Sequence, residues 1–298
     1  MLRDCTDGSS MYVMTPTFLS GITARLTPIS DTPALDASVL IAHIVNQPRT
    51  WVMAHPELTL TIEQQKQLDS SLARLENGEP FPYVLGHWEF FGLDFELTPD
   101  VLIPRPETEL LVEKAIAWLQ KSPERSRVAD VGTGSGVIAV SIAVNVRNVH
   151  VLASEISRKA LNIAQKNARK FNVAQRIDFM KCDLLPSKSS FEHHSSIDLI
   201  CANLPYIPTE TLHELPIFGR EPTIALDGGP DGLDPYRKLF SLAPAWLASH
   251  GKMLLEIEAR QGTKIIEMAG DTFPKANIQL YKDLSGHDRL LEITLSET

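Results

Sequence analysis

The sequence predicts an α/β fold, in which a parallel-rich sheet is covered by helices on both faces and preceded by a helical bundle and a β-hairpin connector. Runs typical of strands alternate with helical runs from Arg127 onward, whereas the chain up to about Gly78 has helical periodicity. Strand–helix alternation is typical of parallel sheets with helices on both faces. The length of 298 residues fits two domains of ~100–200 residues each.

Seven runs in the second part have the apolar, β-branched composition of buried strands. They are Val128–Val131, Val149–Ser154, Ile177–Met180, Ile197–Ala202, Met253–Ile257, Asn277–Tyr281 and Leu290–Thr294. Between the first strands, the clearest helical stretch carries Ala160, Leu161, Ala164, Ala168 and Phe171 on one face. The segment from Pro208 to Leu233 has little regular pattern, and we expect an ordered active-site loop there, because long loops in compact domains are usually functional or disordered.

Capping signals predict helices in the first part of the chain. Asp31 is expected to cap one helix, and Thr61 with Gln64 forms a capping-box pattern for another that Gly78 would end. The apolar faces of these two helices are expected to carry Leu35, Val39, Leu40 and Ile44, and Ile62, Leu68, Leu72 and Leu75.

The segment from Phe81 to Asp100 changes character, because Gly86 and Gly92 punctuate short aromatic runs. This pattern predicts a hairpin, and Trp88, Phe90 and Phe91 are more typical of a hairpin core than of a base-stacking platform. A helix is expected to begin near Glu107. We therefore expect a helical domain over residues 1–80, a hairpin linker over 81–104 and an α/β domain over 105–298.

The formal net charge of −9 disfavours a general nucleic-acid binder, which would need a basic excess to neutralise phosphates. Cys5, Cys182 and Cys201 are scattered, which predicts neither a disulfide framework nor a zinc site. His43, His87 and His287 are interpreted as structural histidines, and no metal is expected. We find no signal-peptide pattern and no run of ~20 apolar residues, so we expect a cytoplasmic protein without membrane contact.

A glycine-rich turn, Gly132-Thr133-Gly134-Ser135-Gly136, follows the strand that carries Asp130. Glycines are needed where the backbone turns sharply and a ligand approaches closely. A dinucleotide site usually reads G-x-G-x-x-G and holds a pyrophosphate. The G-x-G-x-G spacing and the acidic Asp130 instead suit a ligand with an ammonium and a sulfonium group. The turn resembles the first motif of class I S-adenosylmethionine-dependent methyltransferases.

Two further acids follow the next strands of the predicted sheet. Glu155 ends the second strand, where a carboxylate can accept hydrogen bonds from both ribose hydroxyls. Asp183 follows the third strand, where the methyltransferase pattern places a contact to the adenine amino group, with Leu184 against the ring. Taken singly, the turn is also compatible with a nicotinamide site or a plain tight turn, and each acid with a solvated loop. Their order along the chain favours the methyltransferase interpretation.

The tetrapeptide Asn203-Leu204-Pro205-Tyr206 follows the fourth strand. An amide nitrogen is a poor nucleophile, so an enzyme must hold it with its lone pair directed at the sulfonium methyl. The Asn203 side-chain oxygen and a following backbone carbonyl can accept both amide hydrogens, and Tyr206 can stack on the planar amide; positioning then supplies most of the acceleration. The tetrapeptide resembles the Asn-Pro-Pro-Tyr motif of amino-group methyltransferases, with Leu204 in place of proline. Taken alone, it is also compatible with an ordinary turn.

The chain as a whole resembles the HemK/PrmC-type peptide chain release factor glutamine methyltransferases from about Leu35 to the C-terminus. The two most specific segments are the run Ile103-Pro104-Arg105-Pro106-Glu107-Thr108-Glu109 and the loop from Glu221 to Leu233. Further likenesses are Tyr83–Gly86, the glycine-rich turn, Asn203–Tyr206, Tyr236-Arg237, Leu254–Ile257 and Gly286–Arg289.

The resemblance implies a Rossmann-like, seven-stranded class I methyltransferase domain, and an N-terminal helical domain that helps to recognise a release factor. It implies that S-adenosyl-L-methionine donates a methyl group to the glutamine of the factor's Gly-Gly-Gln loop and leaves as S-adenosyl-L-homocysteine. A monomer with no direct nucleic-acid partner suffices for this reaction. The implied cofactor contacts are Asp130, Gly132, Thr133, Gly134, Ser135, Gly136, Glu155, Asp183, Leu184 and Asn203, and the implied catalytic and substrate contacts are Asn203, Leu204, Pro205 and Tyr206.

Three other functions compete with this interpretation. A DNA adenine amino-group methyltransferase uses a similar tetrapeptide but needs a basic cleft and usually a target-recognition domain. A nicotinamide-dependent oxidoreductase is disfavoured by the glycine spacing and Asp130. A non-catalytic module with vestigial cofactor binding is disfavoured by the intact Asn203 and Tyr206. The segment Arg105, Glu107 and Glu109 is also compatible with a simple charged helix start.

Overall fold

The structure is a computed structural model that describes residues 12–13, 16–186 and 196–296, so Cys5 lies outside the described residues. The chain divides into two compact units, Met1–Gly86 and His87–Thr298. The expected linker 81–104 is therefore divided between them. Each unit is described by itself.

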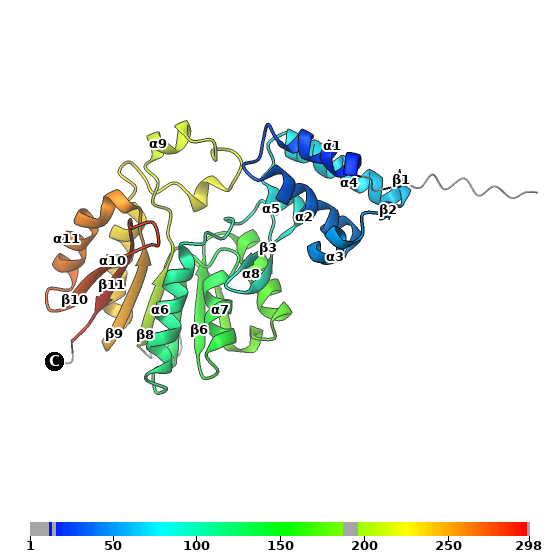
Figure 1. Cartoon of the computed structure of the whole chain (residues 1–298). Coiled ribbons are helices and arrows are strands. Elements are labelled where there is room, and N and C mark those ends of the chain that lie inside the picture. The colour runs from blue at the N-terminus through cyan, green and yellow to red at the C-terminus, as the bar shows by residue number, and fades with distance from the viewer. Residues whose placement is uncertain (1–11, 14–15, 187–195, 297–298) are drawn as a thin grey trace, which may run out of the picture. The chain divides into compact units, whose positions relative to one another are not determined.

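The first unit is helical (Figure 1). Its helices are α1 Pro16–Leu26, α2 Pro33–Val45, α3 Arg49–Ala54, α4 Ile62–Glu76 and α5 Phe81–Leu85, and the short strands β1 Tyr12–Val13 and β2 Thr59–Leu60 pair antiparallel. The core lies where α1, α2 and α4 pack together, and its largest fully buried side chains are Leu26, Leu40, Ile41, Leu60, Leu68 and Leu72.

The capping box at the start of α4 is confirmed. Thr61 Oγ1 accepts a hydrogen bond from Gln64 N, and Gln64 Oε1 accepts one from Thr61 N. Gly78, with a φ of 86°, follows the end of α4, as a glycine suits the left-handed residue after a helix. Leu68, Leu72 and Leu75 are buried, whereas Ile62 is exposed because it stands in the first turn.

The prediction of an Asp31 cap for α2 is wrong. The N-cap residue is Thr32, and the helix begins at Pro33, whose fixed φ and missing N–H suit the first helical turn. The buried face also differs from the predicted one: Ala37, Leu40 and Ile41 are buried, whereas Leu35 is 42% exposed.

The second unit opens with a β-hairpin, as predicted. Strands β3 His87–Phe90 and β4 Leu93–Glu96 pair antiparallel. The turn residues Phe91 and Gly92 both have positive φ, 53° and 72°, which matches the right-handed twist of a two-residue hairpin. Phe90 is fully buried, as predicted for the hairpin core, and so is Phe95, whereas Trp88 and Phe91 are only half-buried.

A seven-stranded sheet follows the hairpin in the described part of the second unit, in the order β10-β11-β9-β8-β5-β6-β7. Strands β5 to β9 run parallel, and β11 pairs antiparallel with β9 and β10. The strands are β5 Arg127–Val131, β6 His150–Glu155, β7 Ile177–Lys181, β8 Ile197–Ala202, β9 Leu247–Glu256, β10 Asn277–Lys282 and β11 Asp288–Thr294.

All seven predicted strands are confirmed, although β9 begins at Leu247 rather than at Met253. The first residues of β9 could not be predicted as strand, because the polar run Ser249-His250-Gly251 interrupts the apolar pattern. The pairing of β9 with β8 also has a register shift in this region.

Helices cover both faces of this sheet (Figure 1). Successive strand residues face opposite layers: Val128, Leu199 and Leu254 pack with one set of helices, and Ala129, Ile200 and Leu255 with the other. The first set is α6 Thr108–Gln120, α7 Val137–Asn145 and α8 Arg158–Lys170; the second is α10 Asp234–Trp246 and α11 Gly262–Thr272. The predicted face of α8 is confirmed, with Ala160, Leu161, Ala164 and Ala168 buried. No helix in the described residues is long and apolar enough to cross a membrane.

The loop from Pro208 to Leu233 holds more structure than its sequence pattern suggests. It contains the short helix α9 Thr209–Glu214 and a 3-10 helix, Thr223–Ala225; two other 3-10 helices lie at Ala174–Arg176 and Ala259–Gln261. Ile207 forms an isolated parallel bridge with Asp227, so the loop returns to the carboxyl end of β8.

Candidate active site

The glycine-rich turn joins β5 to α7 at the carboxyl edge of the parallel strands. Gly132, Gly134 and Gly136 have φ values of 74°, 56° and 85°, a region that side-chain-bearing residues rarely adopt. A Cβ on Gly136 would stand 3.2 Å from Ala164 Cα, and one on Gly132 would stand 3.1 Å from a methyl of Leu204. The turn therefore needs glycine for its conformation and for close packing.

Asp130 lies beneath this turn rather than in the wall of a cavity. It is fully buried, and its Oδ2 accepts hydrogen bonds from Thr133 Oγ1 at 2.6 Å and from Ala139 N at 3.0 Å. Its Oδ1 is buried and has no hydrogen-bond partner among the described residues. Burial raises the pKa of Asp130 to about 6. Asp130 thus holds the turn and the first residues of α7 in place.

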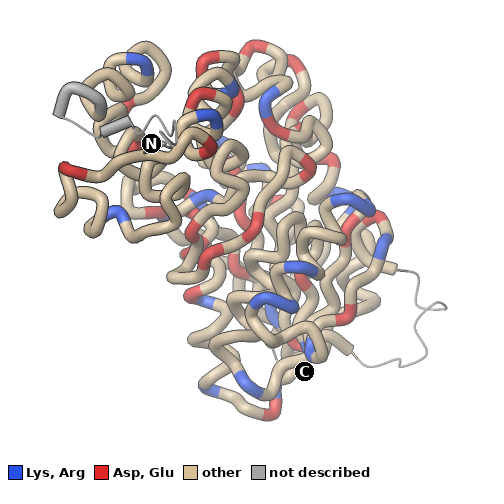
Figure 2. Tube along the Cα trace, turned by 90° about the vertical axis from the view of Figure 1, so that its right-hand side faces the viewer, with Lys and Arg blue, Asp and Glu red and all other residues tan. Residues whose placement is uncertain are grey.

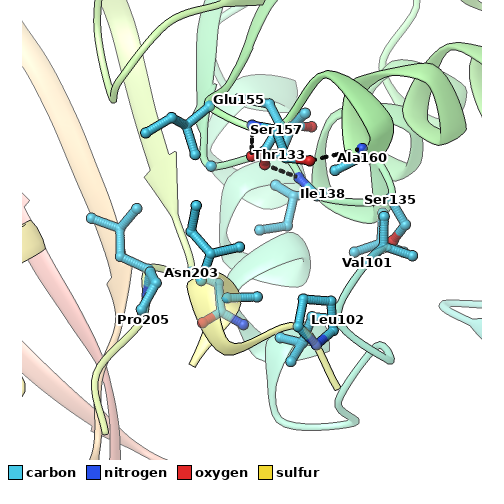
Figure 3. Close-up of a pocket in the computed structure, with 18 of the residues that line it drawn as sticks. Val101, Leu102, Thr133, Ser135, Ile138, Glu155, Ser157, Ala160, Asn203 and Pro205 are labelled. Atoms are coloured by element: carbon cyan, nitrogen blue, oxygen red, sulfur yellow. Dashed lines mark hydrogen bonds between the residues drawn. The ribbon is translucent and has the colours of Figure 1, made fainter. Parts of the chain in front are cut away.

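Glu155, at the end of β6, faces the turn and lines the cavity beside it (Figure 3). Its Oε2 accepts a hydrogen bond from Gly134 N at 3.0 Å, and its Oε1 accepts one from Ser157 N at 2.8 Å. Each carboxylate oxygen has a second acceptor position, so Glu155 can still accept hydrogen bonds from a ligand.

Asp183 and Leu184 follow β7 and also line this cavity. Asp183 Oδ2 forms an ion pair with Lys238 of α10, and both side chains are about half-exposed. The predicted adenine acceptor is thus already paired with a flexible surface lysine.

The cavity between these residues has a volume of about 280 Å³ and also contacts Asn203, Leu204 and Pro205. In Figure 3, Glu155 and Ser157 lie at the top of the view and Asn203 and Leu102 toward the bottom. The lining carries more negative than positive groups. Among the described lining residues, Arg105 alone is basic, whereas four are acidic: Asp100, Glu155, Asp183 and Asp227. Such a lining suits a cationic ligand and disfavours a pyrophosphate.

A second, smaller cavity of about 120 Å³ adjoins the same tetrapeptide and contacts Tyr206, Ile207, Ile217 and Leu226. Asn203 and Leu204 line both cavities, and so do Leu102 and Arg105. Asn203 therefore stands where two separate ligands could meet.

The Asn203 side chain is oriented by a buried network. Its Nδ2 donates a hydrogen bond to Thr108 Oγ1 at 3.0 Å, and Thr108 Oγ1 donates one to Glu256 Oε2 at 2.6 Å. Tyr206 OH donates to Glu256 Oε1 at 3.4 Å. Burial raises the pKa of Glu256 to about 7 and the pKa of Tyr206 above its ordinary value. Asn203 Oδ1 makes no hydrogen bond within the described residues, so it is free to accept one.

Leu204 is buried, and its side chain packs against the glycine-rich turn. Tyr236 OH donates to Glu256 O at 2.5 Å and stands 3.4 Å from Leu204 O. A hydroxyl has one hydrogen, and the shorter contact takes it, so the Leu204 carbonyl stays available. Pro205 follows in the wall of the larger cavity.

Sequence reasoning assigned no role to Thr108, Glu221, Tyr236 or Glu256. Glu221 accepts hydrogen bonds from Arg105 Nη2 at 2.6 Å and from Ile103 N at 3.0 Å, and so joins the segment before α6 to the long loop. All four lie in the segments on which the family resemblance depends, but nothing in their local pattern marks a contact to a distant residue.

The described residues hold no group of three His, Cys, Asp or Glu side chains arranged to bind a metal ion. His87 Nδ1 lies 2.5 Å from Asp94 Oδ1 in the hairpin, and His87 lines neither of the two cavities. Cys182 and Cys201 are free thiols.

Known proteins resemble both parts of the chain. Residues 17–86 match the family model of the PrmC N-terminal domain, and residues 107–214 match that of the methyltransferase small domain. The release factor glutamine methyltransferase of Moorella thermoacetica is 40% identical over 86% of this chain and 89% of its own. The enzyme of that name from Coxiella burnetii is 38% identical over 91% of this chain and 95% of its own. The solved hMettl16 catalytic domain shares the fold, with 15% identity, a TM-score of 0.53 and coverage of 81% of this chain and 85% of that chain.

Proposed function

The chain belongs to the family of release factor glutamine methyltransferases, and on this premise we propose that it methylates the side-chain amide of the glutamine in the Gly-Gly-Gln loop of a translation release factor. It is a methyltransferase whose second unit has the Rossmann-like class I fold. The observation that carries the proposal is the position of Asn203 in the wall of both cavities, because a donor and an acceptor must meet at one point.

The larger cavity is the proposed site of S-adenosylmethionine, which supplies an activated methyl group on a sulfonium. Two features of this cavity fit that molecule: an excess of carboxylates and a glycine-rich turn that admits a ligand closely. Glu155 would hold the ribose hydroxyls, and Asp183 with Leu184 the adenine. Asp130 would act through its charge beneath the turn.

The smaller cavity is the proposed site of the acceptor glutamine. Asn203 Oδ1 and the Leu204 carbonyl would accept the two amide hydrogens, and the Tyr206 ring would pack on the amide plane. Holding the nitrogen in this orientation removes the entropic cost that its alignment has in solution. This is the main contribution that positioning can make to the rate. The amide proton leaves after transfer, so the site needs no general base before it.

Charge also supports a protein acceptor over DNA. The formal net charge is −9, and acidic and basic residues are interspersed along most of the described trace (Figure 2), with α8 Arg158–Lys170, which carries five basic and no acidic residues, as an exception. Both cavities are built by residues of one chain, so a monomer suffices for the proposed reaction. A release factor as substrate would place the reaction in the cytoplasm.

The test is mass spectrometry of a purified release factor after incubation with the protein and S-adenosylmethionine. We expect one added methyl on the loop glutamine, its loss with Asn203→Ala, and its retention with Asn277→Ala, an exposed asparagine on β10. A methyl on DNA adenine, with none on the factor, would instead assign the site to the nucleic-acid acceptor.

A further inference from the structure

A chain of hydrogen bonds runs from Asn203 into the core of the second unit. Asn203 Nδ2 donates to Thr108 Oγ1, at the first residue of α6, and Thr108 Oγ1 donates to Glu256 at the end of β9. Thr108 is 2% exposed and Glu256 is 1% exposed. The chain therefore joins three elements, and its inner members are buried, although Thr108 also lines the larger cavity.

The direction of these bonds determines which atom of Asn203 faces the cavities. A carboxylate only accepts hydrogen bonds, so a charged Glu256 takes the one hydrogen of the Thr108 hydroxyl. Thr108 Oγ1 is then left with lone pairs alone, and it can bind only the NH₂ group of Asn203. Asn203 Oδ1 must consequently point away from Thr108. The opposite amide orientation would place an NH₂ group against the N–H groups of an acceptor amide.

We propose that Thr108 and Glu256 are positioning residues that hold the Asn203 amide in the one orientation in which Oδ1 accepts a hydrogen bond from the acceptor. This inference rests on the proposed function, because it concerns the same acceptor. It adds a role for two residues that need not touch the acceptor themselves.

Protonation of Glu256 would release this orientation. A neutral carboxyl can donate to Thr108 Oγ1, and the Thr108 hydrogen can then bind Asn203 Oδ1, which permits the flipped amide. Arg289 on β11 favours the charged form of Glu256, and Glu107, just before α6, opposes it. Tyr206 OH and Tyr236 OH approach the Glu256 side chain and backbone carbonyl, respectively. Burial raises the pKa of Glu256 to about 7, so the change falls within the range of an enzyme assay.

The first test compares kinetics of the wild-type chain with Thr108→Val, Thr108→Ser and Glu256→Gln. Thr108→Val keeps the volume and removes the relay. We expect kcat to fall about 10- to 100-fold, less than the roughly 100- to 1000-fold lost when a preorganised hydrogen bond to the reacting group itself is removed, because Thr108 acts through Asn203. The KM for S-adenosylmethionine should change less than about twofold, and Thr108→Ser should restore most of the rate. A Thr108→Val enzyme with wild-type kcat that still methylates the factor would overturn the inference and leave the proposed function standing.

The second test follows pH. With both substrates well below KM, the wild-type rate should rise as pH increases through about 7, because the charged form of Glu256 holds the productive orientation. In Glu256→Gln, this rise should disappear, and the rate should stay low. A rise of equal size in wild type and Glu256→Gln would overturn the inference.

A third measurement needs no acceptor, and so separates this inference from the proposed function. In ¹⁵N spectra, the side-chain amide signals of Asn203, assigned by their loss in Asn203→Asp, should titrate with a midpoint near 7 in wild type. They should not titrate in Thr108→Val. Titration that persists in Thr108→Val would mean that Asn203 responds to the charge of Glu256 directly, and the relay would be excluded.

Discussion

The buried carboxylate of Glu221 accepts a hydrogen bond from Arg105 Nη2 at 2.6 Å, although the two residues are 116 positions apart. The Glu221 side chain is 4% exposed, and its other oxygen accepts a hydrogen bond from Ile103 N at 3.0 Å. Glu221 thus joins two segments that both contribute to the walls of the cavities. The link holds the segment before α6 against the long loop.

Substituting Glu221→Gln should weaken this link. A glutamine keeps one acceptor oxygen and loses the charge, so Arg105 or Ile103 N loses its partner. We expect the free energy of unfolding to fall by about 1–3 kcal/mol and kcat/KM for the release factor to fall about tenfold. Chemical denaturation and methylation kinetics measure both changes.

The control is Glu76→Gln. Glu76 pairs with Arg25 at 2.7 Å, but both side chains are about 40% exposed, and exposed pairs contribute little. We expect a smaller change in stability and none in the KM for S-adenosylmethionine. Equal losses in the two variants would mean that burial of Glu221 has no special role.

Substituting Gly136→Ala should damage the turn itself. Gly136 has a φ of 85°, and the new Cβ would stand 3.1 Å from Ala164 Cβ and 3.2 Å from Ala164 Cα. We expect a loss of about 2–4 kcal/mol, from left-handed strain and overpacking together, and a loss of S-adenosylmethionine binding in calorimetry.

Gly270→Ala is the matched control for this substitution. Gly270 lies inside α11 with an ordinary φ, and nothing stands within 4 Å of the added Cβ. Alanine there should stabilise the chain by up to about 1 kcal/mol and leave binding unchanged. Binding that survives in Gly136→Ala would show that the turn tolerates a side chain and contradict the assigned cradle.

Gly136 belongs to a local motif that the sequence predicts, whereas the role of Glu256 depends on a contact with a distant residue that the sequence does not predict. The strands, the hairpin and the glycine-rich turn follow from patterns within a few residues, so their positions could be predicted closely. Thr108 and Glu256 are 148 positions apart, and each looks like an ordinary helix-start or strand residue. Their contact depends on how α6 packs against β9, which local pattern does not encode. Asp31 failed as a cap for a different reason: Pro33 provides a stronger helix start two residues later.

The hydrogen-bond partners of Asp130 could not be predicted either, although the sequence indicated an acidic residue at this position. A carboxylate beside a glycine-rich turn was expected to contact the ligand, and its Oδ2 instead binds Thr133 and Ala139 N. Which way an acidic side chain points after a strand depends on the nearest unsatisfied donors, and here these are in the turn itself.

Substituting Lys238→Met should tighten the binding of S-adenosylmethionine. In the structure, Lys238 pairs with Asp183, the proposed adenine acceptor, and must give way when the adenine binds. Exposed pairs contribute about 0.2–1 kcal/mol, so we expect Kd to fall about two- to fivefold in calorimetry. The difference should shrink at high salt, which screens exposed charges.

Lys264→Met is the control for the loss of one positive charge. Lys264 lies on the neighbouring helix α11, is 65% exposed and lies 4.0 Å from Asp231 rather than beside Asp183. It should leave Kd unchanged. Weaker binding in Lys238→Met would contradict the competition and assign Lys238 itself to the adenine site.

Asp130→Asn should change how stability depends on pH. Burial raises the pKa of Asp130 from 3.8 to about 6, although the hydrogen bonds from Thr133 and Ala139 N oppose that rise. Because the folded-state pKa lies above the unfolded one, the favourable contribution is complete below about pH 4 and is lost as pH rises through about 6. At pH 7 the charged, buried carboxylate therefore costs on the order of 3 kcal/mol at most relative to low pH.

An asparagine at this position keeps an oxygen for both donors and carries no charge. We therefore expect the unfolding free energy of Asp130→Asn, relative to wild type, to rise between pH 4 and pH 7, measured by urea denaturation at each pH. The same substitution at exposed Asp178 on β7 controls for the loss of a surface carboxyl. S-Adenosylmethionine should bind Asp130→Asn more weakly, because the negative charge beneath the turn is gone. Parallel stability curves for Asp130→Asn and wild type would mean that folding does not raise the pKa of Asp130, and its buried Oδ1 would then need a partner that stabilises the charged form.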